Sequence, residues 1–195
     1  MPSTTDSAVL VQLRDVLVEI YAVNDAMNQI LLAHIDPQAW RAELPRSTPL
    51  PGPKRGSVRT IAAIFAHMHN CRLLWLKWNA PHLKRPARLD PDRCTMKQAS
   101  AACKRSAAQC LRMLTDALSA APNRKVTKFS RGWGRAWPAG GTMFAYMFSH
   151  EAHHRGQILT LAHQLGYRLP NQPAAGAIWG WDKLWKDHGF TTRPR

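Results

Sequence analysis

A long amphipathic repeat near the N-terminus constrains the fold more than any other feature of the chain. Between residues 7 and 34, apolar side chains recur at intervals of three and four, which places them along one side of an α-helix. The repeat consists of Leu10, Leu13, Leu17, Ile20, Tyr21, Met27 and Leu31, with the polar Asn24 on the same side. It ends near Pro37, because proline cannot continue a helix. Such a helix must bury its apolar side against other elements.

Three further helices are predicted, each bounded by a capping side chain, glycine or proline. They cover residues 57–79, 96–120 and 142–165. Ser57 and Thr95 are suited to cap the first two, and prolines follow both. No segment alternates apolar and polar residues as a strand would. We therefore expect an all-α protein whose residues 1–195 form a single domain, a four-helix bundle with one or two long crossing connections.

Tryptophan is concentrated in two segments outside the four helices. A short C-terminal helix over residues 178–188 carries Trp179, Trp181 and Trp185. The loop over residues 130–141, SRGWGRAWPAGG, is too aromatic for a simple linker, so we expect its tryptophans to dock on the bundle or border a pocket. Either segment could supply the face of a homodimer.

Composition excludes several classes of protein. The first residues, MPSTTDSAVLVQLRD, lack the regions of a signal peptide, and no apolar run is long enough to span a membrane, so we expect a cytoplasmic protein. The net charge of +15 favours polyanions at low salt. However, the basic residues are scattered and no nucleic-acid module is recognisable, so nucleic acid is an unlikely partner.

The cysteines do not indicate a metal knuckle. They are Cys71, Cys94, Cys103 and Cys110, and none forms a C-x-x-C pair. Reduced, partly buried thiols are the expectation for a cytoplasmic chain. Cys103 and Cys110, seven residues apart, should share a core-facing stripe.

The fourth predicted helix contains His-Glu-x-x-His, formed by His150, Glu151 and His154. Residues four apart lie about 40° apart on a helix, so the two histidines project side by side, on a face continued by Gln157. That face is otherwise built for the bundle interior. Burying two imidazoles without partners costs on the order of 1–3 kcal/mol each, and a divalent metal would supply the missing partner.

The second predicted helix offers two candidates for a third ligand. His67 shares a face with Thr60, Ile64, Cys71, Leu74 and Trp78. His69 points about 200° away from His67, so only one of the two can meet the pair on the fourth helix. His67 lies on the smoother apolar stripe and is preferred.

The same motif also occurs in zinc peptidases, but the rest of that pattern is missing. The extended form needs glycine and histidine where this chain has Gln157 and Thr160, and no glutamate follows Glu151. The wheel places Glu151 about 100° from His150, off the inward stripe, so we interpret it as an ordinary surface glutamate. His153 is likewise interpreted as a surface or helix-contact residue.

The segment SHEAHHRGQILTLAHQLGY resembles the signature of the DinB/YfiT-like family, as does AHMHNCRLLWL. The closing AIWGWDKLWKDHGF is similar to tails in one branch of that family, and the resemblance spans roughly residues 9–190. It implies a four-helix bundle, frequent homodimers, and a divalent metal (zinc, nickel or iron) held by His67, His150 and His154. It also implies an activity related to thiol-dependent transferases that use small bacterial thiols.

Three protein imidazoles leave at least one coordination position open, as in catalytic sites. A metal would lower the pKa of a bound thiol or water, and the resulting nucleophile would attack an electrophile held beside the site. Asn24, Asn28 and Gln157 are candidates to orient a ligand imidazole or the substrate. Arg155 could clamp a carboxylate, but a surface position is preferred for it.

Three classes of function stay open. The leading hypothesis is a metal-dependent transferase or hydrolase acting on a small molecule. The alternatives are a metal-binding stress-response protein without turnover and, less favoured, a basic nucleic-acid-binding protein.

Overall fold

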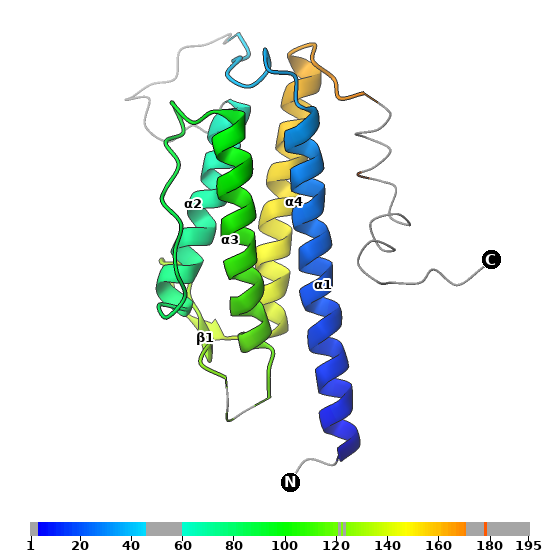
Figure 1. The fold of residues 1–195 in the computed structure, drawn as a ribbon, viewed down its shortest axis with the longest axis vertical. Coiled ribbons are helices and arrows are strands. Elements are labelled where there is room, and N and C mark those ends of the chain that lie inside the picture. The colour runs from blue at the N-terminus through cyan, green and yellow to red at the C-terminus, as the bar shows by residue number, and fades with distance from the viewer. Residues whose placement is uncertain (1–3, 46–59, 121, 123, 171–177, 179–195) are drawn as a thin grey trace, which may run out of the picture.

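The computed structural model describes residues 4–45, 60–120, 122, 124–170 and 178. Four helices dominate this part of the chain: α1 (Thr4–His34), α2 (Ile61–Asn79), α3 (Met96–Ala117) and α4 (Gly141–Gln164). They lie side by side with their long axes nearly aligned (Figure 1). The all-α prediction is confirmed, and the predicted helix ends fall within a few residues of the observed ones.

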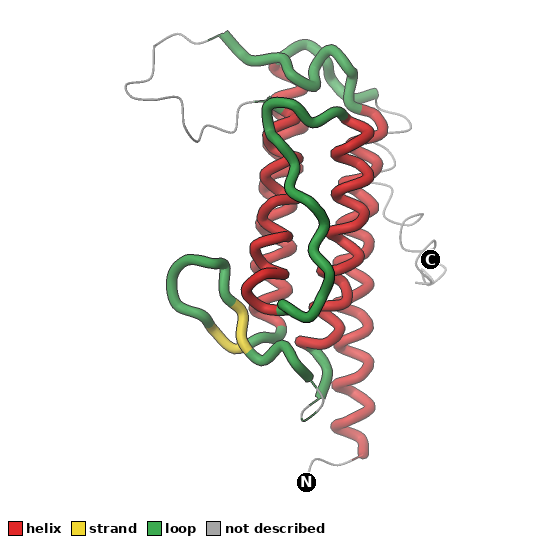
Figure 2. The backbone as a smooth tube through the Cα atoms, turned by 60° about the vertical axis from the view of Figure 1, so that its left-hand side comes forward, coloured by secondary structure: helices red, strands yellow, loops and turns green. Residues whose placement is uncertain are grey.

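The helices pack as an antiparallel bundle with one long crossing. α1 and α4 run in one direction, and α2 and α3 run in the other (Figure 1). Each of α1 and α2 packs against both α3 and α4, so α1 and α2 occupy opposite corners of the bundle. Because α2 and α3 are parallel, residues 80–95 travel the length of the bundle to connect them (Figure 2). The sequence predicted one or two such connections but did not indicate which helices they join.

Side chains of α2 anchor this crossing. His69 Nε2 lies 2.9 Å from the Ala87 carbonyl oxygen. Asn70 donates to the Leu89 carbonyl at 3.0 Å and accepts from the Leu89 amide at 3.1 Å. The crossing is therefore held by hydrogen bonds to the helix that carries one of the candidate ligands.

Capping explains where α2 and α3 begin. Thr60, not Ser57, caps α2: its Oγ1 accepts from the Ala63 amide at 3.1 Å. Residues 57–59, where the prediction began the helix, lie outside the described part of the chain. Thr95 caps α3 as predicted, and Gln98 completes a reciprocal capping box.

A two-stranded hairpin joins α3 to α4, which the sequence did not predict. Strand β1 (Lys128–Phe129) pairs antiparallel with β2 (Trp137–Pro138). Strands of two residues are too short to show an alternating pattern, which explains the miss. The predicted docking of the tryptophan-rich loop is met by Trp137, whose ring packs against Phe129 and Tyr146, whereas Trp133 is 64% exposed.

The core fills the space between the helices along most of the bundle. Tyr21, Phe65, Trp75, Phe129 and Met113 are all essentially inaccessible to solvent. The amphipathic repeat of α1 is buried from Tyr21 onward, but Leu13 is 53% exposed, because the first turns of α1 extend past the other helices (Figure 1).

The cysteines are free thiols, as expected. Cys103 and Cys110 both lie in the core and Cys71 is half-buried. Of the predicted tail helix, residues 178–188, only the buried Ile178 lies within the described residues. Among the helices that the structure describes, none combines the length and apolar character needed to cross a membrane.

Candidate metal centre

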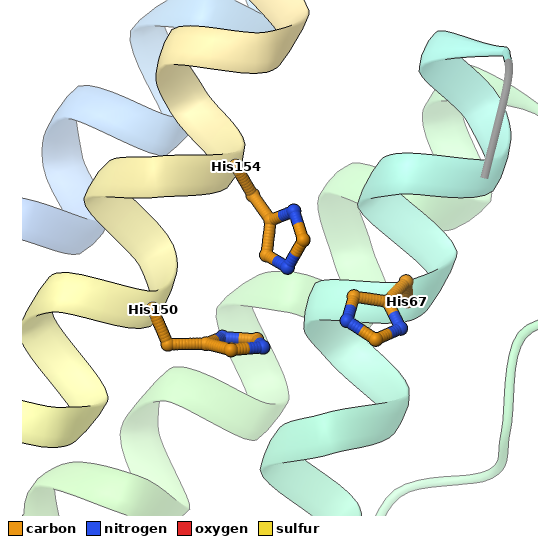
Figure 3. A group of neighbouring side chains, drawn as sticks. All are labelled: His67, His150 and His154. Carbon is orange, nitrogen blue, oxygen red and sulfur yellow. The ribbon is translucent and has the colours of Figure 1, made fainter.

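His67 of α2 meets His150 and His154 of α4 between the two helices. One ring nitrogen from each lies within 4.8 Å of those of the other two. The ring centroids are 5.4 Å apart for His67 and His150, 4.6 Å for His67 and His154, and 4.5 Å for His150 and His154. The rings of α4 point across toward His67, each turning a nitrogen into the shared space (Figure 3).

The position of these residues on their helices explains the convergence. His150 and His154 are one turn apart on α4, and α2 packs beside α4, so a single inward residue on α2 completes the triangle. His67 lies at the edge of the buried side of α2. The side of α2 that was predicted to be an apolar stripe is in fact its more solvent-exposed side, since Leu74 is 39% and Trp78 53% exposed.

All three imidazoles are held neutral. Burial, together with the neighbouring His154 and His67, lowers the pKa of His150 to about 4. Burial also lowers the pKa of His67 and of His154, although the hydrogen bond to Gln157 opposes the latter shift. At neutral pH each ring therefore carries a free lone pair, which is the form that binds a metal.

Gln157 orients one of the three rings. Its Oε1 lies 2.7 Å from His154 Nδ1. Because a carbonyl oxygen only accepts, this bond keeps the proton on Nδ1 and leaves the lone pair on Nε2. Gln157 is thus in contact with a candidate ligand, where the sequence placed it.

His150 has no such partner. Its Nδ1 is buried and makes no hydrogen bond within the described residues. Its ring packs instead against Trp75, with centroids 5.2 Å apart, and Tyr146, at 6.2 Å. A buried imidazole without a polar partner is costly in a folded protein unless something else binds it.

Cys71 is the thiol nearest to the cluster. Its Sγ lies 3.5 Å from His67 Nε2. Burial raises the pKa of this thiol to about 11, so it is protonated at neutral pH. The three imidazoles are therefore the nitrogen donors of the site, with a neutral thiol beside one of them.

His69 and His153 are not members of the cluster, as predicted. His69 is fully buried on another side of α2, with Nδ1 3.0 Å from Ser106 Oγ and Nε2 bonded to the Ala87 carbonyl. His153 is exposed on α4. His69 is a satisfied core histidine, so its absence from the cluster needs no further explanation.

Glu151 is not a surface residue, and that prediction was wrong. Its side chain is 0% exposed and pairs with Arg72 of α2, whose Nε and Nη2 donate to the two carboxylate oxygens at 2.8 and 2.6 Å. Tyr21 donates to the same carboxylate at 2.6 Å. Burial raises the pKa of Glu151, but the charge of Arg72 and the hydrogen bonds from Arg72 and Tyr21 together outweigh burial and lower it.

Asn24 and Asn28 bind this carboxylate rather than a histidine ring. Their Nδ2 groups donate to Glu151 at 2.8 and 2.9 Å. Their Oδ1 atoms accept from Arg155 at 2.7 and 3.0 Å. Arg155 is therefore buried, and the surface position preferred for it was wrong.

One physical reason underlies both errors. α4 packs against α1 on one side and α2 on another, so it buries more than the single stripe that a wheel assumes. Residues about 100° from the histidine face, such as Glu151 and Arg155, face α1 instead of solvent. The available signal was the pair Asn24 and Asn28, four residues apart on the apolar side of α1, together with Arg72 in an apolar helix.

The model of the DinB family matches residues 10–180 of the chain. The chain belongs to the DinB family. That assignment agrees with the resemblance carried by the histidine motif and with the helical bundle. No curated protein and no solved structure gives a match to the chain.

Proposed function

We propose that this DinB-family protein binds one divalent metal ion, zinc, nickel or iron, through His67, His150 and His154. The observation that carries the proposal is the meeting of three neutral imidazoles from two helices, with donor nitrogens within 4.8 Å of one another. Neutral imidazole suits each of these ions, and affinity alone does not choose among them. The buried, unpartnered Nδ1 of His150 also indicates a ring that the protein itself does not satisfy.

The arrangement best supports an enzyme, a metal-dependent transferase acting on a small-molecule thiol. Three protein ligands leave a coordination position open, which is typical of catalytic rather than structural sites. When bound, the ion supplies Lewis acidity, which lowers the pKa of a thiol or water in that position. The thiol is proposed from the family resemblance.

Residues around the cluster would support this chemistry. Gln157 holds His154 in the tautomer that presents Nε2. Trp75 and Tyr146 pack on His150 and restrict water on that side. Glu151, bound to Tyr21 and Arg72, fixes α4 against α1 and α2, and so sets the position of its neighbour His150.

Metal analysis tests the site. Protein purified without a metal-affinity column should contain about one divalent ion per chain, and His67→Ala, His150→Ala and His154→Ala should each lose it. His153→Ala is the matched control, because this histidine is exposed on the same helix. The site is wrongly assigned if wild type carries no stoichiometric metal or if the three variants retain it.

Turnover tests the enzyme. The metal-loaded protein is mixed with a model electrophile and a panel of small bacterial thiols, and loss of the free thiol is followed. Metal- and His150-dependent consumption supports a transferase. Stoichiometric metal without turnover of any thiol would favour the second candidate, a metal-binding protein without catalysis, which the same three histidines also fit. A homodimer and a cytoplasmic location stay predictions.

A further inference from the structure

Arg131 lies in an aromatic enclosure beside the histidine cluster. Its guanidinium carbon is 3.8 Å from the ring centroid of Trp133, 5.2 Å from that of Trp137 and 5.6 Å from that of Tyr146. Cation–π attraction of this kind holds a guanidinium in place while leaving its N–H groups available. The side chain is half-buried.

The loop that carries Arg131 is built to hold it. Asn79, at the end of α2, accepts from the Ser130 amide at 2.6 Å and donates to the Ser130 carbonyl at 2.8 Å. Gly132 then adopts a φ of +89° against the Trp78 indole, where a Cβ would lie 2.7 Å from Nε1. Only glycine fits that approach and that conformation. The residues on both sides of Arg131 are therefore fixed.

Two N–H donors of the enclosure, one on Arg131 and one on Trp137, have no acceptor in the described part of the chain. Arg131 Nε and Trp137 Nε1 are both buried and make no hydrogen bond within the described residues. No described carboxylate forms an ion pair with Arg131 either. Buried N–H groups are rarely left in this state, so a half-buried cation beside a second free donor is the pattern expected of an anion-binding position.

This position adjoins the candidate metal centre. Tyr146 lies next to both: its ring is 6.2 Å from that of His150, and the Arg131 guanidinium carbon lies over the Tyr146 ring at 5.6 Å. Burial raises the pKa of the Tyr146 phenol, and the nearby positive charge of Arg131 opposes that rise. A small molecule could thus reach the three histidines with one end and Arg131 with the other.

We propose that Arg131, Trp137 and Tyr146 form a binding subsite for the carboxylate group of the small molecule that reacts at the three histidines. The inference rests on the proposed function, because the other end of that molecule must reach the metal. A planar guanidinium matches a carboxylate with two parallel hydrogen bonds. A singly charged carboxylate also loses less hydration than a phosphate dianion on entering an aromatic enclosure.

A series of ligands of increasing chain length tests the subsite. Cobalt(II)-loaded protein is titrated with mercaptocarboxylates of increasing length, from mercaptoacetate to mercaptohexanoate, and with mercaptoalcohols of the same lengths. Sulfur-to-cobalt absorption reports binding of each. At the length that spans the two positions, the carboxylate should bind about tenfold or more tightly than its alcohol, because charge-assisted hydrogen bonds replace neutral ones.

Substitutions in the loop test whether the preference for the carboxylate over the alcohol arises from the subsite. Arg131→Gln should remove the difference between acid and alcohol, and Trp137→Phe, which keeps an aromatic ring but loses the N–H, should reduce it severalfold. Arg135→Gln should preserve it, because Arg135 is exposed in the same loop. Equal affinities of acid and alcohol at every length in wild type, or equal losses in the two arginine variants, would overturn the proposal.

Failure of the metal site gives a different result. If cobalt does not bind, or binds equally well to His150→Ala, the proposed function is wrong whatever the ligands do. The subsite is then tested in metal-free protein by tryptophan fluorescence: hexanoate should give a saturable change that hexanol does not, and Arg131→Gln should abolish it. Without that change in wild type, the subsite is also wrong.

Discussion

Two groups of buried polar side chains lie on different sides of α4, and they differ in how completely the protein satisfies their hydrogen bonds. The carboxylate network consists of Glu151, Arg72, Tyr21, Asn24 and Asn28. Within it, Glu151 accepts five hydrogen bonds at 2.6–2.9 Å. In the histidine cluster (His67, His150 and His154), the next residue along the chain, His150, has a buried nitrogen with no partner.

This difference in hydrogen bonding indicates that the carboxylate network stabilises the fold and that the histidine cluster binds a ligand. A buried charge is tolerated when its partners complete its hydrogen bonds, and removing one partner is then costly. A buried imidazole that the fold leaves incomplete adds little stability and is available to a ligand. The carboxylate network should therefore dominate the free energy of unfolding, and the histidine cluster should dominate metal binding.

The largest expected effect is at Glu151. Glu151→Leu leaves Arg72 buried without its main counterion and should lower the free energy of unfolding by about 3–5 kcal/mol, measured by urea denaturation of metal-free protein. The double variant Arg72→Met with Glu151→Leu should lose less than the single one, because the fully buried charge of Arg72 is removed with its counterion, and Asp25, which also pairs with Arg72, is partly exposed. A single-variant loss below about 1 kcal/mol would contradict the role given to the network.

Gln157→Leu should act on the metal and not on the fold. Losing the hydrogen bond that sets the tautomer of His154 should weaken metal binding about 10- to 100-fold, measured by competition with a chelator. Stability without metal should hardly change, since Gln157 is exposed. Gln164→Leu, an exposed glutamine at the end of α4, is the control. Equal affinities of the two variants would remove Gln157 from the site.

Acid should destabilise the metal-free protein through His150. In the unfolded chain this histidine takes up a proton near its ordinary pKa of 6.5, but in the fold it resists protonation until about pH 4. The unfolded state therefore binds more protons between these values, and the free energy of unfolding falls as pH drops through that window. Allowing for the partial exposure of the ring, the loss should be on the order of 1 kcal/mol.

A substitution within the cluster itself should also have a small effect on stability. His150→Phe retains the ring that packs on Trp75 and Tyr146 and removes the unpartnered nitrogen, so metal-free stability at pH 7 should stay within about 1 kcal/mol of wild type. The variant should bind no metal, and its stability should depend less on acid than that of wild type. A loss like that of Glu151→Leu would mean that the cluster is structural after all.

Much of the site was predictable because short-range spacing controls it. His150 and His154 share a face of α4 through helical geometry alone, and Gln157 follows them on that face. His67 was preferred over His69 because of an apolar stripe that is in fact the more exposed side of α2, yet the structure does bring His67 to the pair while hydrogen bonds satisfy His69 elsewhere. The hairpin was missed because strands of two residues carry no period.

The sequence by itself determined the four helices, their approximate ends, and the pair of histidines that shares one face of α4. These properties depend on local periodicity, caps and breakers, which act over a few residues. Only the tertiary structure decided that Glu151 and Arg155 are buried, that Arg72 neutralises the carboxylate, and that Arg131 stands beside Tyr146. Those facts depend on which helix or loop packs on each side of α4. A helical wheel describes one helix alone and gives no information about the elements that pack around it.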